Sequence, residues 1–452
     1  MMNYSMLTMA ALCCALACNG PAAKPEEKTP EGRAPWLAQS NIYEVNLRQY
    51  SPEGSFNAFT AQLPRLKEMG VEILWFMPVT PIGVEGRKMN PGDLGSYYAV
   101  KDYKAVSPEF GTENDWKNLV EKAHEAGFKV IVDWVANHTA PDHPWIKAHP
   151  DFYMRDSAGT ILPPNADWTD TRELNYENPV LRDSMIAAMN WWLATYKIDG
   201  FRCDIAEEVP VDFWAQAIPE LRKTKQIFML AEGEKPALHQ AGFDATYTWS
   251  VFHVLNDIAA GKKNTVFLDS ILLDNQSRFP PDALRMYFTS NHDENSWNGT
   301  EFERMGAGAE TFAVFTQTMD KSLPLIYSGQ ESANAKRLKF FTRDPIQWGT
   351  YEKAPFYKKL LSLRKSNPVF DEGATFSRIA SSNPSIFAFV RENKKDKLVV
   401  ILNFTGENQA FTWDDSSLTG KFTDVFSATG YELNPGTALN LAGWQYLVLE
   451  NK

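Results

Sequence analysis

Short apolar runs alternate with stretches of helical periodicity along most of this chain. Residues 71–77 and 128–135 are rich in Val, Ile, Leu and Phe and predict buried strands, and residues 42–46 predict a first strand. Apolar positions recur at helical spacing between these runs, and two of the helical segments end at Gly70 and Gly127. Strands that alternate with helices in this way favour an α/β fold, and we expect a parallel (β/α)8 TIM barrel.

The pattern changes after residue 368, where the helical periodicity disappears. Short β-rich runs take its place at residues 386–390, 398–404 and 444–449, and turn sequences separate them. This pattern predicts a C-terminal antiparallel β-domain, and we expect a β-sandwich.

Ionisable side chains lie at the C-terminal ends of four apolar runs in the predicted barrel. The acidic residues among them are Asp133, Asp204, Glu232 and Asp293. Charged side chains at these positions cannot belong to the core. In a β/α barrel the C-terminal strand ends meet at one mouth, where reactive groups collect, so we expect the acidic residues to converge there.

The spacing of these residues supports the barrel and reveals an insertion. The 28 residues from Asp204 to Glu232 make one strand–helix unit, whereas the 71 residues from Asp133 to Asp204 are too many for one. The surplus lies after His138, in sequence rich in Pro, Asp and Trp, and residues 179–196 then predict the helix before the fourth strand. We therefore expect a small inserted subdomain at the mouth of the barrel.

These patterns predict the following organisation. We expect a signal peptide with a lipobox (1–18), a disordered tether (19–38), a barrel (39–137 and 179–367), an inserted B subdomain (138–178) and a C-terminal β-sandwich (368–452).

The N-terminal sequence predicts an export signal. Residues 7–17 form an apolar stretch that is too short for a stable membrane anchor and that ends in small residues. The segment from Ala15 to Cys18 resembles a bacterial lipobox, although Ala15 stands where Leu is usual. We expect lipidation at Cys18 and a location in the periplasm or on the outer membrane of a Gram-negative bacterium. Plain signal cleavage without a lipid is the alternative.

Composition and charge exclude several classes of partner. The net charge of −11 argues against nucleic acid and anionic membranes, whereas a neutral polymer is compatible with it. Only Cys203 lies outside the N-terminal segment, so the mature chain cannot form a disulfide framework, and no Cys or His cluster has zinc spacing. We expect a monomer.

Three of the acidic residues suit glycoside hydrolysis, which needs one ionised and one protonated carboxyl group. Strand alternation puts Arg202 and Asp204 on one side of their strand, so the guanidinium would lower the pKa of Asp204. Glu232 follows four apolar residues, and desolvation would raise its pKa and leave it a proton to donate. Asp293 could accept hydrogen bonds from sugar hydroxyls.

Each of these residues also has a structural explanation when it is taken alone. Arg202 and Asp204 could form an ion pair that only stabilises a strand end, and Asp133 could brace the barrel rim. His138 or His292 alone would more often be a structural histidine than a substrate contact. The occurrence of all of them, in order and at barrel spacing, favours function.

The four segments that carry these residues resemble, in order, the four conserved regions of glycoside hydrolase family thirteen, the α-amylase family. The likeness runs from about residue 40 to the C-terminus and includes the stretches 97–103 and 110–112. It implies a barrel with a B subdomain and a C-terminal β-sandwich. It also implies a retaining hydrolase with Asp204 as nucleophile, Glu232 as acid/base and Asp293 as transition-state stabiliser.

The resemblance also implies contacts with the sugar that is attacked. His138, Arg202 and His292 would surround this sugar, and Tyr97 would stack beneath it. Glu234 is a rival for the acid role, but the alignment of strand ends favours Glu232.

Many members of this family hold a structural calcium ion beside the B subdomain. Asn137 matches one ligand, and Glu173 lies where an aspartate ligand is common. The alternative is that Asn137 only hydrogen-bonds the loop, and the chemistry itself needs no cofactor. One departure from the family is Glu207-Glu208, which replaces a Lys-His pair and puts a subsite beyond the cleavage point in doubt.

The expected substrate is an α-1,4-linked glucan of the starch type or a maltooligosaccharide. Transglycosylation or α-1,6 action by the same site is an alternative, as is a non-catalytic glycan-binding protein of the same fold. The sequence does not separate endo from exo action.

Overall fold

The computed structural model describes residues 34–88, 90–414 and 418–451. Eight strands form one parallel sheet in the order β10-β1-β2-β3-β6-β7-β8-β9. Their bounds are β1 (Ile42–Val45), β2 (Ile73–Phe76), β3 (Lys129–Trp134), β6 (Gly200–Cys203), β7 (Phe228–Ala231), β8 (Ala245–Tyr247), β9 (Leu284–Met286) and β10 (Leu325–Tyr327).

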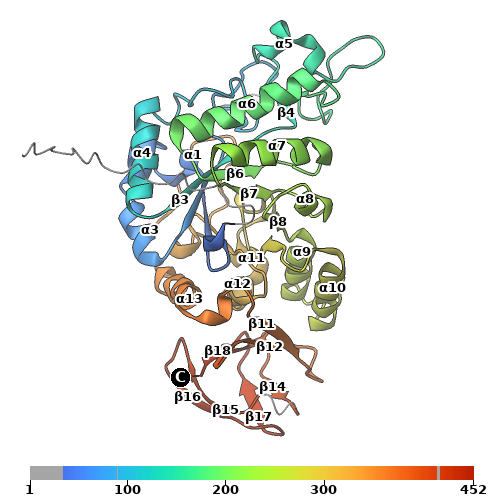
Figure 1. Ribbon diagram of the computed structural model, residues 1–452. Helices are drawn as coiled ribbons and strands as arrows, with labels where there is room; N and C mark the ends of the chain where they lie inside the picture. The colour runs from blue at the N-terminus through green and yellow to red at the C-terminus, as the bar shows by residue number, and fades with distance from the viewer. Residues whose placement is uncertain (1–33, 89, 415–417, 452) are drawn as a thin grey trace, which may run out of the picture.

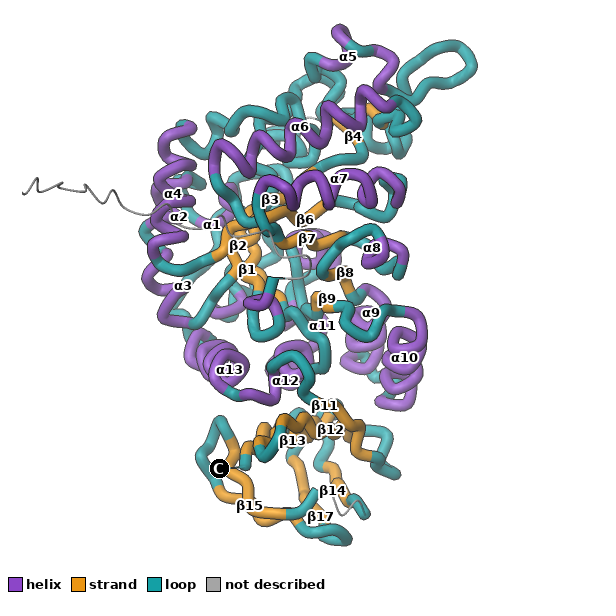
Figure 2. The backbone as a smooth tube through the Cα atoms, in the orientation of Figure 1, coloured by secondary structure: helices purple, strands orange, loops and turns teal. Residues whose placement is uncertain are grey.

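The two edge strands of this sheet approach each other and nearly close the barrel. The Leu323 N–H donates to the Arg285 carbonyl at 2.8 Å, and the Leu325 N–H donates to the Tyr287 carbonyl at 2.9 Å. The predicted TIM barrel is therefore confirmed, and Figure 2 shows its strands enclosed by helices.

Helices surround the sheet, and those beside the first strands follow from the sequence. The helices are α1 (Leu47–Tyr50), α2 (Phe56–Thr60), α3 (Leu63–Met69), α4 (Glu113–Glu125), α5 (Trp145–Ala148), α6 (Pro179–Tyr196), α7 (Val211–Thr224), α8 (Ala237–Gln240), α9 (Trp249–Ala259), α10 (Thr265–Arg278), α11 (Glu301–Met305), α12 (Ala309–Thr318) and α13 (Ala354–Ser366). Helix α4 begins at a capping box between Thr112 and Asp115. Helix α6 has the predicted bounds, with Asn178 as its N-cap and Pro179 in its first turn.

The segment between β3 and α6 forms no barrel strand. Its own strands, β4 (His138–Thr139) and β5 (Arg172–Glu173), pair antiparallel, with His138 opposite Glu173. In Figure 1 this insert, with α5, lies at the opposite end of the molecule from the C-terminal sheets.

The C-terminal part consists of antiparallel sheets, as predicted. Six strands pair in the order β11-β12-β13-β18-β15-β16, and β14 pairs with β17. Their bounds are β11 (Thr375–Ile379), β12 (Ile386–Asn393), β13 (Asp396–Asn403), β14 (Gln409–Thr412), β15 (Gly420–Asp424), β16 (Gly430–Leu433), β17 (Ala438–Leu441) and β18 (Tyr446–Glu450).

Alternation along β12 explains how the larger sheet buries both of its faces. Phe387 lies against Phe315 of α12, with ring centroids 5.5 Å apart. The next residue, Ala388, belongs to a second core cluster that contains Phe411 of β14. The sheet is therefore held between the barrel helices and the β14–β17 pair.

The predicted signal peptide and the lipobox cysteine lie outside the described residues. The tether is shorter than predicted, because Ala34 and Leu37 are buried against the barrel core. No helix in the described part of the chain is long and apolar enough to cross a membrane.

Candidate active site

The three predicted catalytic carboxylates lie around one pocket of about 460 Å³. Asp204 follows β6 directly, Glu232 follows β7 directly, and Asp293 lies beyond the end of β9. Gly200 permits the close approach of β6 and β7, because a Cβ at its φ of +150° would lie 1.9 Å from the Phe228 carbonyl oxygen. Three distant segments of sequence thus meet at the mouth of the barrel.

The Arg202 guanidinium contacts two of these carboxylates. Its Nη1 donates to Asp204 Oδ1 at 3.0 Å, and its Nη2 lies 2.9 Å from Glu232 Oε2. Nη1 also donates to Asp133 Oδ1 at 2.9 Å. The guanidinium is fully buried, so these ion pairs are shielded from water. Arg202 and Asp204 do share a side of their strand, as the alternation predicts.

The expected electrostatic effect of Arg202 is outweighed by burial. Burial and the neighbouring Glu232 carboxylate raise the pKa of Asp204 well above its ordinary value, although Arg202 lowers it. Burial also raises the pKa of Asp133 to about 6, against the pull of Arg202. The prediction that the guanidinium would keep the pKa of Asp204 low was wrong, since one cation is shared among three buried carboxyl groups.

Glu232 is oriented by the chain beyond β6, and its rival Glu234 is not in the pocket. The Ile205 N–H donates to Glu232 Oε2 at 2.7 Å. Glu234 instead accepts from Arg285 Nη2 at 2.6 Å and from the hydroxyl of Ser250 at 2.7 Å, and it does not line the pocket. The geometry therefore favours Glu232 as the proton donor.

Asp293 is paired with His292, which lies behind the pocket. His292 Nε2 is 3.2 Å from Asp293 Oδ2, and Nδ1 is 2.5 Å from Glu44 Oε1. Burial opposes a charge on His292, but the Asp293 and Glu44 carboxylates raise its pKa well above the ordinary value. The imidazolium in turn lowers the pKa of Asp293, against the effect of burial. His292 and Arg202 thus contact the carboxylates rather than line the pocket.

His138 does line the pocket, and it is neutral. Burial lowers its pKa to about 4. Its Nε2 is buried and has no hydrogen-bond partner among the described residues. A buried imidazole nitrogen without a partner at a pocket wall is suited to a sugar hydroxyl.

The tyrosine of the pocket is Tyr98 rather than the predicted Tyr97. Tyr97 is 1% exposed, lies outside the pocket and has its ring 3.9 Å from the Arg48 guanidinium carbon. Tyr98 lines the pocket, and its hydroxyl donates to Asp133 Oδ2 at 3.2 Å and lies 2.8 Å from His292 Nε2. Tyr97 and Tyr98 lie in a turn that places only the second ring at the pocket, so the candidate stacking position is one residue later than predicted.

Sequence reasoning missed the aromatic rim of the pocket. Trp168 is 40% exposed and Trp297 is 55% exposed, and both line it together with Phe340 and Phe341. An exposed tryptophan beside a polar pocket offers a flat apolar face to a sugar ring. No periodicity in the sequence distinguishes these positions from core aromatics.

The two predicted calcium ligands lie at the paired strands of the insert, with Asn137 directly before β4 and Glu173 in β5. They contain no group of three or more His, Cys, Asp or Glu that could hold a metal ion. The Asn137 side-chain nitrogen lies 3.4 Å from His138 Nδ1, and the pKa of Glu173 is raised by burial and by the Glu208 carboxylate. The described acidic, histidine and cysteine side chains thus give no support to the expected calcium ion, which stays a prediction.

Comparisons with protein families place two known models on this chain. The model of the alpha amylase catalytic domain matches residues 37–168 and 165–352. The model of the alpha-amylase SusG C-terminal domain matches residues 386–448.

Curated relatives agree with these matches. Alpha-amylase MalA of Haloarcula japonica is 28% identical over 400 residues, which cover 84% of this chain and 57% of MalA. Alpha-amylase 2 of Dictyoglomus thermophilum is 24% identical, with 88% of this chain and 74% of the relative covered. The chain thus spans little more than half the length of MalA.

Solved structures show the same architecture. The maltogenic alpha-amylase AmyB from Thermotoga neapolitana superposes with a TM-score of 0.85 at 30% identity, covering 92% of this chain and 99% of AmyB. An alpha-amylase from Lactobacillus plantarum superposes with a TM-score of 0.83 at 29% identity, covering 93% of this chain and all of that chain.

Proposed function

Because this chain belongs to the α-amylase family of glycoside hydrolases, we propose that it cleaves α-1,4-glucosidic bonds of starch-like glucans or maltooligosaccharides with retention. The observation that carries the proposal is the pair of carboxyl groups on one buried guanidinium, Asp204 on Nη1 and Glu232 on Nη2. A shared guanidinium favours the short separation, about 5 Å, that the retaining mechanism requires.

In this mechanism Asp204 attacks the anomeric carbon while Glu232 protonates the leaving oxygen. Glu232 then removes a proton from water, which releases the glycosyl group from Asp204. Asp293 is ionised, because His292 lowers its pKa, and it accepts hydrogen bonds from ring hydroxyls as the sugar flattens. The neutral His138 completes the contacts to the same sugar.

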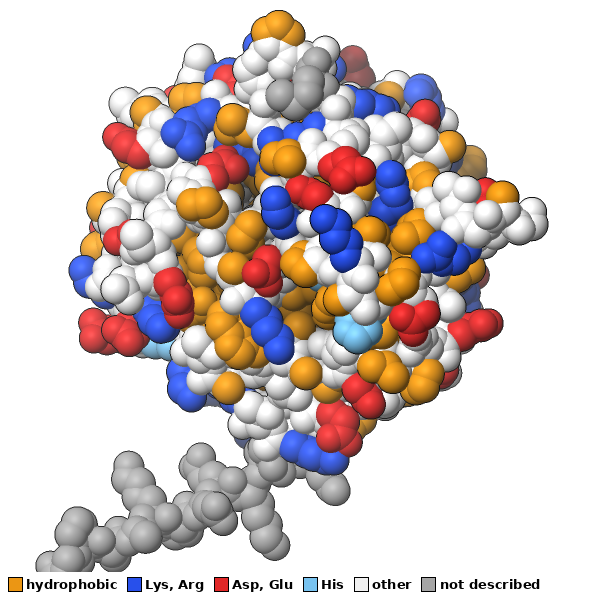
Figure 3. All heavy atoms as spheres, turned by 90° about the horizontal axis from the view of Figure 1, so that it is seen from above, with side chains coloured by type: hydrophobic (Ala, Val, Ile, Leu, Met, Phe, Trp, Pro, Cys, Tyr) orange, Lys and Arg blue, Asp and Glu red, His pale blue; other side chains and the backbone are white. Residues whose placement is uncertain are grey.

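A neutral substrate agrees with the surface around the insert. Seen from above, acidic and basic side chains are interspersed over this face rather than gathered by sign (Figure 3). Such a surface does not select for a strongly charged polymer. The presence of all three carboxylates at the pocket favours a hydrolase over a non-catalytic glycan-binding protein.

The test is a product profile on soluble starch, pullulan and trehalose, measured side by side. We expect reducing sugar from starch, and loss of activity in Asp204→Asn with binding of maltooligosaccharide retained. Glu234→Gln is the matched control, because Glu234 lies two residues beyond Glu232 but outside the pocket. Unchanged turnover in Asp204→Asn refutes the nucleophile, and activity on trehalose alone, which has no α-1,4 bond, refutes the linkage.

The same site becomes a transglycosylase if an oligosaccharide reaches the glycosyl enzyme before water does. Incubation with maltoheptaose separates the outcomes, because hydrolysis gives only shorter products. Products longer than maltoheptaose would assign the chain to the transferases of this family instead.

We also propose that the protein is exported and carries a lipid at Cys18. The lipobox resemblance and the SusG-like C-terminal domain support this proposal. Metabolic labelling with palmitate should mark the wild-type chain and not Cys18→Ala. Equal labelling of both chains, or of neither, contradicts it.

A further inference from the structure

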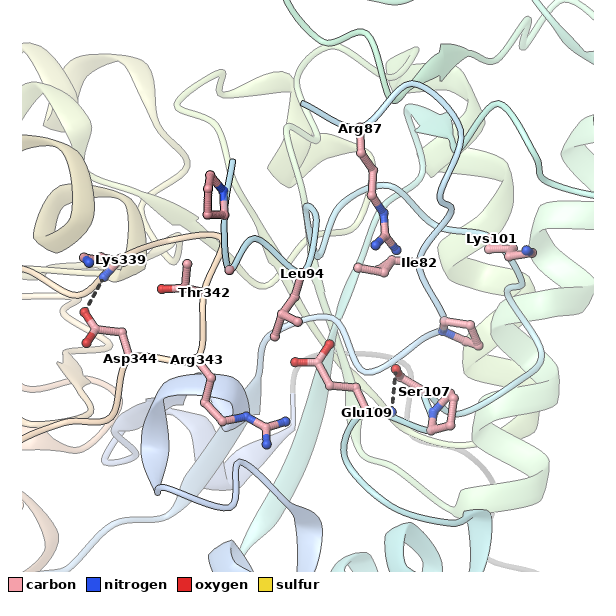
Figure 4. A pocket seen from close by; sticks show the side chains of 14 residues that line it. Ile82, Arg87, Leu94, Lys101, Ser107, Glu109, Lys339, Thr342, Arg343 and Asp344 are labelled. Carbon is pink, nitrogen blue, oxygen red and sulfur yellow. Dashed lines mark hydrogen bonds between the residues drawn. The ribbon is translucent and has the colours of Figure 1, made fainter. Parts of the chain in front are cut away.

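A second, larger pocket of about 860 Å³ lies beside the candidate active site. Its walls come from the loop after β2, which includes Ile82 and Leu94, and from the loop after β10, which includes Lys339 and Arg343 (Figure 4). The two pockets have one lining residue in common, Arg87. The Arg87 side chain therefore lies between the two pockets and separates them.

The loop that carries Arg87 is tied down on both sides of the active-site pocket. On one side the Thr169 hydroxyl of the insert donates to the Gly86 carbonyl at 2.7 Å. On the other side the Leu94 N–H donates to the Phe341 carbonyl at 2.8 Å. The loop is thus anchored at Gly86 to the insert and at Leu94 to the loop after β10.

Arg87 itself is held in place within this loop. Its Nε donates to the Gly83 carbonyl at 2.5 Å. A Cβ at Gly95 would lie 2.6 Å from the same Nε, so the side chain packs directly on the Gly95 backbone. Gly95 has a φ of +93°, a conformation that a larger residue rarely adopts.

We propose that Arg87 closes one end of the active-site pocket, so that the enzyme binds the ends of α-glucan chains rather than their interiors. This inference rests on the proposed function and adds the substrate form to it. A closed end lets a chain enter only as far as its terminal residues. Without the Arg87 side chain the two pockets would join into one groove, through which an internal segment could pass.

The test compares maltoheptaose with cyclomaltoheptaose, which has the same number and type of bonds but no chain ends. For the wild type we expect kcat/KM on the cyclic substrate to be about a hundredfold lower. Maltoheptaose labelled at its reducing end should give one labelled product of fixed length at early times. A wild-type ratio near one, or a random distribution of early products, overturns the inference whatever the variants do.

Variants separate the role of Arg87 from other effects. Arg87→Ala should raise the cyclic-to-linear ratio about tenfold, and Arg87→Met, which keeps most of the bulk, should raise it less. Arg155→Ala is the matched control: Arg155 also donates to a backbone carbonyl four residues away, that of Gly159, and it lines neither pocket. Melting temperatures establish that each variant is folded.

An unchanged ratio in folded Arg87→Ala overturns the inference, and so does an equal rise in Arg155→Ala. If Arg87→Ala does not fold, the inference is judged from the cyclic-to-linear ratios of kcat/KM of the wild type and of Arg87→Met. Failure of the proposed function gives a different result, because then maltoheptaose is not cleaved at all or Asp204→Asn cleaves it as the wild type does.

Discussion

Glu44 offers a way to change the charge of the site without touching the pocket. It belongs to β1, is fully buried, and its Oε1 lies 2.5 Å from His292 Nδ1. The substitution Glu44→Gln keeps the volume and removes the negative charge. We expect the pKa of His292 to fall, because Asp293 then remains as the principal carboxylate that supports the imidazolium.

The size of this fall follows from the geometry. Two unit charges about 4 Å apart interact by about 4 kcal/mol at an effective dielectric constant of 20, which equals about three pKa units. Burial raises the pKa of Glu44, so about three pKa units is an upper limit for its effect on His292. We therefore expect the pKa of His292 to fall by about one to three units.

The sign of the pH dependence is fixed by the direction of the His292 shift. Its pKa in the folded protein lies above the unfolded value of about 6.5, so its stabilising contribution is complete below that pH. The contribution is lost as the pH rises through the folded-state pKa. In Glu44→Gln this loss, and the loss of the imidazolium beside Asp293, should begin at lower pH.

The assay is kcat/KM on maltoheptaose between pH 5 and 10, with melting temperatures over the same range. The alkaline limb of the activity profile should move to lower pH by at least about one unit. Glu331→Gln is the control, because Glu331 is equally buried but bonds Tyr43 and Arg65 instead of His292. Superimposable alkaline limbs for Glu44→Gln and the wild type would refute the role given to this carboxylate.

Three further predictions concern the pocket and the metal. Tyr98→Phe removes the hydroxyl that contacts Asp133 and His292 and should lower kcat/KM on maltoheptaose by about tenfold to a hundredfold, whereas Tyr97→Phe should stay within about twofold; equal effects would contradict the assignment of Tyr98. Trp297→Ala should raise KM about fivefold, through the loss of about 1 kcal/mol of stacking, with kcat little changed. Treatment with EDTA followed by dialysis should shift the melting temperature by less than about 2 °C. A calcium ion bound at about a hundredfold excess over its Kd would stabilise the fold by about 2.7 kcal/mol, and its removal would give a larger shift. A larger shift that calcium alone reverses would support the predicted metal site.

The barrel could be predicted because its signals are local and repeated. Val, Ile, Leu and Phe runs bounded by glycine identify β2 and β3 to within a few residues, and the cap residues identify α4 and α6. The end of the tether could not be predicted in this way. Its burial depends on the barrel surface against which Ala34 and Leu37 pack, and composition alone does not contain that surface.

The candidate site could be predicted as a set of strand ends, but not in its finer details. A strand end fixes where a residue stands, which is why Asp204, Glu232 and Asp293 meet as expected. Between adjacent residues such as Tyr97 and Tyr98, the direction of each side chain depends on the path of a loop. The pKa of Asp204 depends on how many buried carboxyl groups share one guanidinium. These groups come from distant parts of the sequence, so their number is known only from the folded structure.

The balance of charge at the site explains why two of its carboxyl groups have raised pKa values. Two cations, Arg202 and His292, lie among five carboxyl groups: Glu44, Asp133, Asp204, Glu232 and Asp293. So large an excess of buried negative charge favours proton uptake, which the raised pKa values of Asp133 and Asp204 express. Asp133, Asp204 and Glu232 all contact the one Arg202 guanidinium, so none of them has this cation to itself. In the proposed retaining mechanism Asp204 attacks as a carboxylate, and Arg202 Nη1, 3.0 Å from Asp204 Oδ1, is the group that stabilises its charge.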